Sequence, residues 1–330
     1  MKTSIITILA TASLLTQCQA KTDTHILSKS STTTAVADTN KSNTDTSLTT
    51  QNDNHPSYEV QAISKDSILV ERCIADAAQY AASIASKDTQ KCHEMLILHI
   101  ARRFLDIPYV AKTLENDDVE RLVVNLRQLD CTTYVENVLA IYLCTKNGKT
   151  QYTDYLENLR KIRYADGNVA YSNRNHYFTE WIEQNTKNGF AEERQTPNPP
   201  FSAEQHLSIN FMSTHSDAYP MLKSNPQLIK PIADMEKHLS GRLYRYIPKA
   251  EITNNATLRS AIHDGDIIAI TTKKSGLDTS HIGIAVWHKD GLHLLNASQI
   301  HKKVVEEPMT LRQYMQKHPS QTGIRIVKIL

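Results

Sequence analysis

The chain has 330 residues, of which 40% are hydrophobic and 22% charged, and its formal net charge is +2. This composition is ordinary for a globular protein, and the length is sufficient for a sizeable core. The near-neutral charge argues against the strongly basic surface of a nucleic-acid-binding protein, so we expect no nucleic-acid partner. After the N-terminus, no apolar run approaches the roughly 20 residues of a membrane-spanning helix.

The first 20 residues have the pattern of an export signal. Lys2 supplies a positive charge, and a short apolar core from Ile5 to Leu15 follows. Two processing events fit the sequence: cleavage after Ala20, or lipidation at Cys18, which ends a segment similar to a bacterial lipoprotein box. We therefore expect a signal peptide at 1–20 and a periplasmic protein, which acyl chains on Cys18 would anchor to a membrane surface.

Residues 21–60 are rich in Thr, Ser, Asn and Asp and predict a disordered tether, because such a segment cannot bury enough apolar surface. Residues 61–330 then form a single domain, and we expect a monomer. Cys73 and Cys92 could pair in an oxidising compartment. On two antiparallel helices that turn near Lys87, however, they would be offset by about 13 Å, which exceeds the reach of a disulfide.

The domain begins with two predicted helices, at 67–85 and 89–104. His93-Glu94 starts like the zinc-binding helix of a metalloprotease, but the next histidine is His99, six places further on. Two histidines must be four residues apart to share one face of that helix. We therefore predict no metal site and no cofactor.

A third helix is predicted to begin at Cys131. Apolar residues recur at i, i+3, i+4 and i+7 from Val135, and Asp130 is a suitable N-cap. The unpaired N–H groups and the dipole at a helix start favour a thiolate, which is the nucleophilic form of cysteine. Cys131 is thus a candidate nucleophile, although a buried structural cysteine, as we expect for Cys144, is the alternative.

The remaining chain predicts one more helix and then an antiparallel sheet. The helix covers about 152–161, and a polar segment dense in Arg, Tyr, His and Asn follows at 162–178. Residues 192–240 contain six prolines (Pro197, Pro199, Pro200, Pro220, Pro226 and Pro231) and predict a long insertion with short helices. Strands are predicted at 266–271, 281–286, 292–297 and 324–329, with a hairpin turn at Lys289-Asp290-Gly291.

A cysteine on a helix, a histidine at a strand start and a polar residue on the next strand follow the order of a papain-like cysteine hydrolase. The thiolate attacks a carbonyl, the imidazole transfers the proton, and the third group fixes the imidazole tautomer. The candidates are Cys131, His281 and Asn296. His281 competes for this role with His288, His293 and His301, and on its own such a histidine is more often structural.

The role of Asn296 makes a geometric demand on the hairpin. If Asn296 lies directly opposite His281, Val286 faces Gly291 across a four-residue loop. A tight Asp290-Gly291 turn would instead pair Lys289 with Leu292 and move Asn296 roughly 13 Å from His281 along the strand. In that case Ser298 becomes the candidate. We predict the longer loop.

Several separated motifs resemble one family in the right order. Asp130-Cys131-Thr132-Thr133, Gly265-Asp266-Ile267-Ile268 and Ser280-His281-Ile282-Gly283 are similar to the NlpC/P60 superfamily of cell-wall cysteine hydrolases. Further segments, spread over roughly residues 90–330, resemble the DUF1460 branch of this superfamily, which is described as N-acetylmuramoyl-L-alanine amidase-like. These segments are Ile107–Val110, Leu129–Glu136, Ile162–Tyr164, Ser172–Phe178, Gly276–Asp278 and Leu294–Ser298.

This resemblance implies an α+β, papain-like fold in which helices pack on an antiparallel sheet and the nucleophile lies at a helix N-terminus. The implied reaction is hydrolysis of the amide between the lactyl group of muramic acid and L-alanine in peptidoglycan fragments, especially anhydro-muropeptides, through an acyl-enzyme. Family members often carry histidine at the position of Asn296, but asparagine can also orient an imidazole. Tyr109 matches a tyrosine whose hydroxyl could help to hold the oxyanion.

The branch-specific segment supplies the candidate substrate-binding residues, which are Arg163, Tyr164, Arg174, His176 and Tyr177. By charge, Arg163 or Arg174 could pair with a peptide carboxylate such as that of D-glutamate. Three alternatives remain open at this point. They are an endopeptidase that cuts γ-D-glutamyl-diamino acid bonds, an acyltransferase with the same Cys–His chemistry, and a non-catalytic wall-binding lipoprotein.

Overall fold

The computed structural model describes residues 65–85, 88–115, 119–196 and 199–330. The predicted signal peptide, Cys18 and the predicted tether lie outside these residues. Among the helices of the described part, none is both long enough and apolar enough to cross a membrane.

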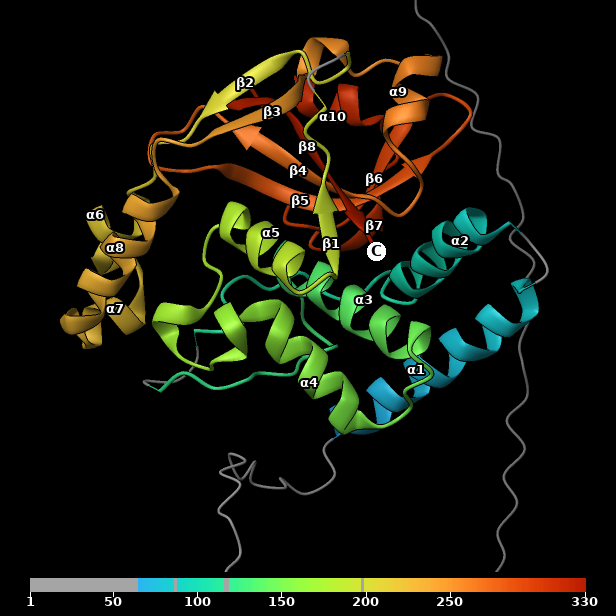
Figure 1. The fold of residues 1–330 in the computed structure, drawn as a ribbon, viewed down its shortest axis with the longest axis horizontal. Coiled ribbons are helices and arrows are strands. Elements are labelled where there is room, and N and C mark those ends of the chain that lie inside the picture. The colour runs from blue at the N-terminus through green and yellow to red at the C-terminus, as the bar shows by residue number, and fades with distance from the viewer. Residues whose placement is uncertain (1–64, 86–87, 116–118, 197–198) are drawn as a thin grey trace, which may run out of the picture. The chain divides into compact units, whose positions relative to one another are not determined.

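Five helices form one layer, and the third of them lies at its centre (Figure 1). They are α1 (Lys65–Ile84), α2 (Thr89–Arg102), α3 (Cys131–Lys146), α4 (Tyr152–Arg163) and α5 (Phe178–Lys187). The four predicted helices are confirmed to within a few residues, whereas α5 was not predicted. α3 contacts α1, α2, α4 and two strands, and every residue from Thr133 to Cys144 is buried. The sequence predicts a single apolar face and so underestimates the burial of α3, which is covered on all sides.

An antiparallel sheet forms the second layer, and the predicted strands belong to it. Its strands are β1 (Ala191–Glu193), β2 (Ala203–His206), β3 (Leu243–Pro248), β4 (Ile267–Thr272), β5 (Thr279–Trp287), β6 (Leu292–Ser298), β7 (Lys303–Glu306) and β8 (Gln321–Ile329). The order is β2-β3-β8-β4-β5-β6-β7, and β1 also pairs with β8. The fold is thus α+β with an antiparallel sheet.

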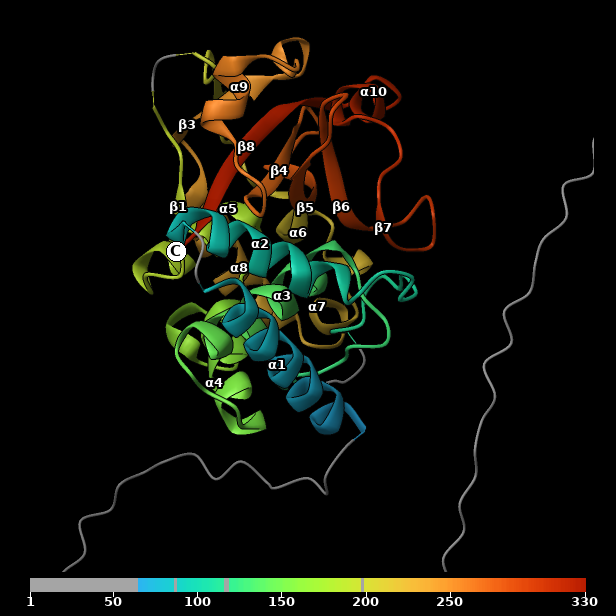
Figure 2. The same ribbon diagram turned by 90° about the vertical axis from the view of Figure 1, so that its right-hand side faces the viewer.

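Both faces of the sheet are covered. Along β4, Ile267 and Ala269 belong to the core shared with α1–α5, whereas Ile268 and Ile270 belong to a second core. That second core includes residues of α9 (Ala256–Ala261) and α10 (Leu311–Gln316), which lie on the far side of the sheet (Figures 1 and 2). A strand between two cores loses the alternation of apolar and polar residues, which is why β4 is buried throughout.

The predicted mid-chain insertion carries short helices, as expected from its prolines. They are α6 (Phe211–Thr214), α7 (Pro220–Ser224) and α8 (Ile229–Leu239), with short 3-10 turns between them at Ser216–Ala218 and Pro226–Leu228. These helices share a small core that includes Met212, Leu222 and Ile232. The sequence analysis missed that β1 and β2, at the start of this region, join the main sheet. Further 3-10 turns lie at Ala165–Gly167, Tyr171–Asn173 and Lys249–Glu251.

A fully buried arginine ties the sheet to the helical layer. Arg325 on β8 forms two hydrogen bonds to the Glu193 carboxylate on β1, with distances of 2.5 and 2.9 Å. Its Nη1 donates to Thr179 Oγ1 at the start of α5 at 2.7 Å. A charge can be buried only when it is paired and hydrogen-bonded in this way. The contact fixes the start of α5, which forms one wall of the site described next.

Candidate active site

Cys131 is the first residue of α3, and the residues around it form a capping box. Asp130 is the N-cap, and its Oδ1 accepts the Thr133 N–H at 2.8 Å, while Thr133 Oγ1 accepts the Asp130 N–H at 2.9 Å. These bonds satisfy two backbone groups that a helix start otherwise leaves unpaired. The predicted helix start and N-cap are therefore confirmed, and they fix the position of the thiol.

The surroundings of Cys131 oppose the thiolate that the helix start favours. The pKa of the Cys131 thiol is raised to about 12, chiefly by burial and in part by the neighbouring Asp130 carboxylate. Hydrogen bonds from the Ile282 backbone and the Thr132 side chain lower the pKa without cancelling that rise. The predicted preference of the helix start for a thiolate is therefore opposed by desolvation, which has the larger effect on this pKa.

His281 on β5 and Asn296 on β6 are joined by a hydrogen bond of 2.9 Å between Nε2 and Oδ1. The strand register is neither of the two that we considered, because Trp287 pairs with Leu292 and Val286 with His293. The His288 N–H donates to the Gly291 carbonyl at 2.9 Å, so the turn contains only Lys289 and Asp290. The predicted four-residue loop is wrong.

Gly283 explains how Asn296 still reaches His281. Continuing the observed register places Asn296 opposite Gly283, so the hydrogen bond to His281 runs diagonally across the strand pair. A Cβ atom on Gly283 would lie 2.9 Å from Asn296 Cβ and 2.8 Å from Leu294 Cδ1. Such separations are too short for carbon atoms, so the glycine provides the space in which Asn296 lies.

The surroundings of Asn296 also define the tautomer of His281. Asn296 is fully buried, and its Nδ2 donates to the Leu294 carbonyl at 3.2 Å, so Oδ1 is the acceptor toward His281. His281 Nε2 therefore carries the hydrogen, which leaves Nδ1 with a free lone pair. Burial lowers the pKa of His281, and the hydrogen bond to Asn296 opposes this shift only in part. The ring is thus held neutral and able to accept a proton.

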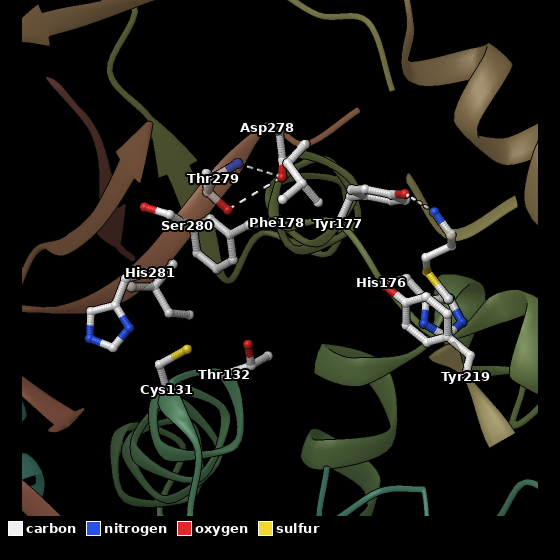
Figure 3. Close-up of a pocket in the computed structure, with 13 residues that line it drawn as sticks. Cys131, Thr132, His176, Tyr177, Phe178, Tyr219, Asp278, Thr279, Ser280 and His281 are labelled. Carbon is white, nitrogen blue, oxygen red and sulfur yellow. Dashed lines mark hydrogen bonds between the residues drawn. The ribbon is translucent and has the colours of Figure 1, made fainter. Parts of the chain in front are cut away.

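Cys131 and His281 face one cavity of about 230 Å³. Figure 3 shows the two side chains next to each other on one side of the cavity, with His176 and Tyr219 on the opposite side. The residues that line it come from α3, the α5 start, the insertion and the β5 start. They are Cys131, Thr132, His176, Tyr177, Phe178, Met212, Tyr219, Leu277, Asp278, Thr279, Ser280, His281 and Ile282.

Two predicted substrate-binding residues do line this cavity. His176 Nε2 donates to the Tyr171 carbonyl at 2.7 Å, and burial together with Arg174 lowers its pKa to about 3. His176 is therefore neutral, and its Nδ1 is an acceptor. The Tyr177 hydroxyl donates to Glu236 at 2.6 Å and accepts the Met212 N–H at 3.0 Å, so only the ring of Tyr177 is left for a ligand.

The other three do not line the cavity and are occupied within the protein. Arg163 forms a buried ion pair with Glu136 at 2.7 Å. Arg174 is paired with Glu115 and donates to the Leu114 carbonyl at 3.1 Å. The Tyr164 hydroxyl donates to Glu120 at 2.7 Å. The predicted role in substrate binding is thus corrected for Arg163, Tyr164 and Arg174, because their polar groups are already bound to acidic side chains within the protein.

Tyr109 lies in an extended segment beside the start of α3. It forms a parallel bridge with Leu129, two residues before Cys131, and its N–H donates to the Lys302 carbonyl at 2.9 Å. The pKa of Tyr109 is raised to about 12, chiefly by burial and in part by the nearby Cys131 and Asp130. Its hydroxyl is therefore protonated at neutral pH and available as a donor.

The sequence analysis assigned no role to several residues of the cavity wall, of which Asp278 is the most informative. Asp278 is buried, and its carboxylate accepts the Thr179 N–H at 2.7 Å and the Thr279 N–H at 2.6 Å. It thereby holds the α5 start beside the β5 start. The motif Gly276-Leu277-Asp278 was visible in the sequence, but nothing there indicates that its carboxylate joins two distant elements.

Comparison with known proteins identifies the family. Residues 99–324 match the AmiA-like family, described as N-acetylmuramoyl-L-alanine amidase-like. The crystal structure of an N-acetylmuramoyl-L-alanine amidase from Bacteroides uniformis is 39% identical, with a TM-score of 0.67 over 72% of this chain and 99% of that chain. The chain therefore belongs to the N-acetylmuramoyl-L-alanine amidase-like family.

Two further structures are similar. A Bacteroides fragilis structure, described provisionally as a xylanase, is 42% identical, with a TM-score of 0.65 over 69% of this chain and 98% of that chain. A Legionella pneumophila protein of the DUF1460 family is 23% identical, with a TM-score of 0.57 over 80% of this chain and 97% of that chain, and supports the fold alone. No curated protein matches the chain.

Replacing Arg163 tests its structural assignment. Arg163→Ala leaves Glu136 buried without a partner, and we expect the free energy of unfolding to fall by about 3–5 kcal/mol. Chemical denaturation measures this loss. Lys187→Ala is the control, because its ion pair with Asp166 is exposed and should contribute about 1 kcal/mol or less. Equal losses in the two variants would contradict the structural role of Arg163.

Replacing Gly283 tests the diagonal contact. In Gly283→Ala the new methyl group displaces Asn296 from His281, so we expect turnover to fall roughly tenfold or more, or about 1.4 kcal/mol in the activation barrier. The buried Ala285 on the same strand provides the control. Ala285→Val also adds volume but leaves the space beside Asn296 unchanged. If both variants lose stability and turnover alike, the contact has no separate importance.

Proposed function

We propose that this protein is a cysteine amidase that hydrolyses the bond between the lactyl group of N-acetylmuramic acid and L-alanine in peptidoglycan fragments. The observation that carries the proposal is the pairing at the cavity. The Cys131 thiol and the His281 imidazole, which Asn296 holds, face the same space. Membership of the amidase-like family and the similarity to the Bacteroides uniformis amidase support the choice of substrate.

The reaction starts from a neutral pair, because both groups are half-buried and desolvation disfavours their charged forms. His281 Nδ1 takes the thiol proton while Sγ attacks the lactyl carbonyl carbon, and a tetrahedral intermediate forms. When the C–N bond breaks, the imidazolium returns this proton to the nitrogen of the leaving L-alanine. A water molecule then hydrolyses the thioester, with His281 again acting as the base. Asn296 keeps the imidazole in the required tautomer throughout, which is the arrangement of a papain-like hydrolase.

The developing oxyanion needs donors near Cys131. The α3 start provides backbone N–H groups and the positive end of the helix dipole. Tyr109 supplies a further candidate, because its hydroxyl remains protonated and lies close enough to Cys131 for a thiolate there to raise the pKa of the hydroxyl. We assign Tyr109 to oxyanion stabilisation on this basis.

The charges in the cavity favour the amidase over two alternatives. A γ-D-glutamyl endopeptidase must accommodate the α-carboxylate of D-glutamate beside the scissile amide, yet none of the 13 lining residues is lysine or arginine. The lactyl–L-alanine bond is flanked by neutral groups. A retaining or inverting glycosidase needs two carboxyl groups, and Asp278 is the single acidic residue among those lining residues.

The aromatic walls fit one end of such a fragment. Tyr177, Phe178 and Tyr219 present rings to the cavity, and the neutral His176 offers an acceptor for an N–H or hydroxyl donor. About 230 Å³ is smaller than a typical drug-sized ligand pocket, so only part of a muropeptide enters it. We also propose export to the periplasm from the signal-like residues 1–20, with Cys18 as the possible lipid anchor.

Product analysis tests the reaction. Incubation with a defined anhydro-muropeptide should release a free stem peptide with L-alanine at its N-terminus, and mass spectrometry identifies it. Cys131→Ser and His281→Ala should each abolish release, whereas Cys73→Ser, on α1, should retain it. A sugar that keeps a dipeptide would establish the endopeptidase instead, and full activity in Cys131→Ser would contradict the nucleophile.

The pH profile tests the base. Because burial lowers the pKa of His281, it is neutral down to a lower pH, and the acid limb of kcat/KM should have its midpoint below the ordinary value of about 6.5. Asn296→Ala removes a hydrogen bond that raises this pKa, so the midpoint should move lower while turnover falls. His318→Gln removes a nearby charge that lowers the pKa, so the midpoint should move higher. Identical limbs in all three proteins would reject His281 as the titrating base.

A further inference from the structure

Three potential metal ligands meet on the β5–β6 hairpin, among residues that do not line the active-site cavity. One ligand atom from each of His288, Asp290 and His293 lies within 4.8 Å of the others. The three side chains differ in exposure, since His293 is 3% exposed and Asp290 63%. The cluster therefore combines a buried imidazole with a carboxylate that is open to solvent.

The hydrogen bonds of His293 leave one of its ring nitrogens facing a carboxylate oxygen. His293 Nδ1 lies 2.8 Å from the Glu307 backbone carbonyl, which can only accept, so Nδ1 carries the hydrogen. The other ring nitrogen, Nε2, is directed at Asp290 Oδ1 at 3.1 Å. An imidazole lone pair and a carboxylate oxygen repel each other at this distance. Either a second proton or a metal ion must therefore lie between them.

His288 has the same division of roles between its ring nitrogens. Its Nε2 is hydrogen-bonded to the Glu306 carboxylate, which also binds Arg102. This leaves Nδ1 of His288 as the free nitrogen. In metal sites a ligating histidine commonly donates its other N–H to a carboxylate or a backbone carbonyl, which orients the ring. Both histidines of the cluster have such a partner.

The backbone that carries the ligands is also fixed. Arg259 Nη2 donates to the His288 carbonyl at 2.9 Å, and Asn254 Nδ2 donates to the Lys289 carbonyl at 3.0 Å. The two histidine rings are stacked with their centroids 4.1 Å apart, so one ring must turn before both imidazole nitrogens can point at the same ion. The backbone itself needs little ordering when an ion binds, which favours binding.

We propose that His288, Asp290 and His293 bind a divalent transition-metal ion of the zinc class, separately from the proposed amidase reaction. Two imidazole nitrogens and one carboxylate oxygen suit Zn²⁺, and water completes a tetrahedral site. Mg²⁺ and Ca²⁺ prefer oxygen ligands and should bind poorly. The sequence analysis predicted no metal because it considered only the His93–His99 spacing, whereas here the ligands approach one another across a tight turn.

Zinc binding by the untagged, chelator-treated chain tests this proposal. Calorimetric titration should give one zinc ion per chain, and saturating zinc should raise the melting temperature. His288→Ala and Asp290→Asn should each weaken binding at least tenfold. His215→Ala, which removes an exposed histidine on the insertion, is the matched control and should bind normally.

Two further measurements separate this site from the alternatives. Cys131→Ser should bind zinc like the unaltered chain, because the catalytic thiol is not a ligand. Magnesium in place of zinc should produce no binding heat and no change in melting temperature. The proposal is overturned if the chain binds no zinc, if His288→Ala and Asp290→Asn bind it unchanged, or if Cys131→Ser abolishes binding.

Discussion

The burial of α3 is the constraint on which the rest of the site depends. Helices α1, α2 and α4 and strands β5 and β6 surround it, so its first residue, Cys131, enters the cavity from a rigid support. The same burial removes water from the thiol and raises its pKa. A helix start usually favours a thiolate, but here desolvation is the larger effect. The packing that fixes the position of Cys131 therefore also makes its thiol harder to deprotonate. A base next to the thiol must take the proton before the sulfur can act as a nucleophile.

His281 meets that need because burial acts on it in the opposite sense. Desolvation favours the uncharged form of both groups, which keeps the thiol protonated and the imidazole unprotonated. The free lone pair is then on Nδ1, since Asn296 fixes the hydrogen on Nε2. A neutral acid and a neutral base are stable together in an apolar site, whereas a permanent ion pair there would carry a large desolvation cost. Charge therefore develops in the proposed reaction only as the substrate is attacked.

The sequence predicted those features that depend on local chemistry. Asp130 indicates the helix start, and the strand and turn signals indicate β5, β6 and β8. The predicted roles of Arg163 and Arg174 were wrong for a different reason. Their partners, Glu136 and Glu115, are distant in the chain, and a guanidinium looks equally suited to a substrate until its buried partner is seen. Burial of α3 on every side was also invisible, because periodicity shows one packed face and not how many neighbours surround a helix.

The β5–β6 turn shows why register could not be read from sequence. The Asp290-Gly291 signal favoured the tight turn and the family resemblance favoured the longer loop, whereas the observed turn is neither. Arg259 and Asn254, from outside the hairpin, hydrogen-bond to carbonyls at this turn. In the observed register Asn296 lies opposite Gly283. Because glycine has no side chain, the Asn296 amide has room to reach His281. The same register also directs His293 toward Asp290 at the other end of the same strand pair. One two-residue turn therefore sets the geometry of the catalytic histidine's partner and of the proposed metal ligands, so an ion bound at the turn would stabilise the register that the amidase site requires.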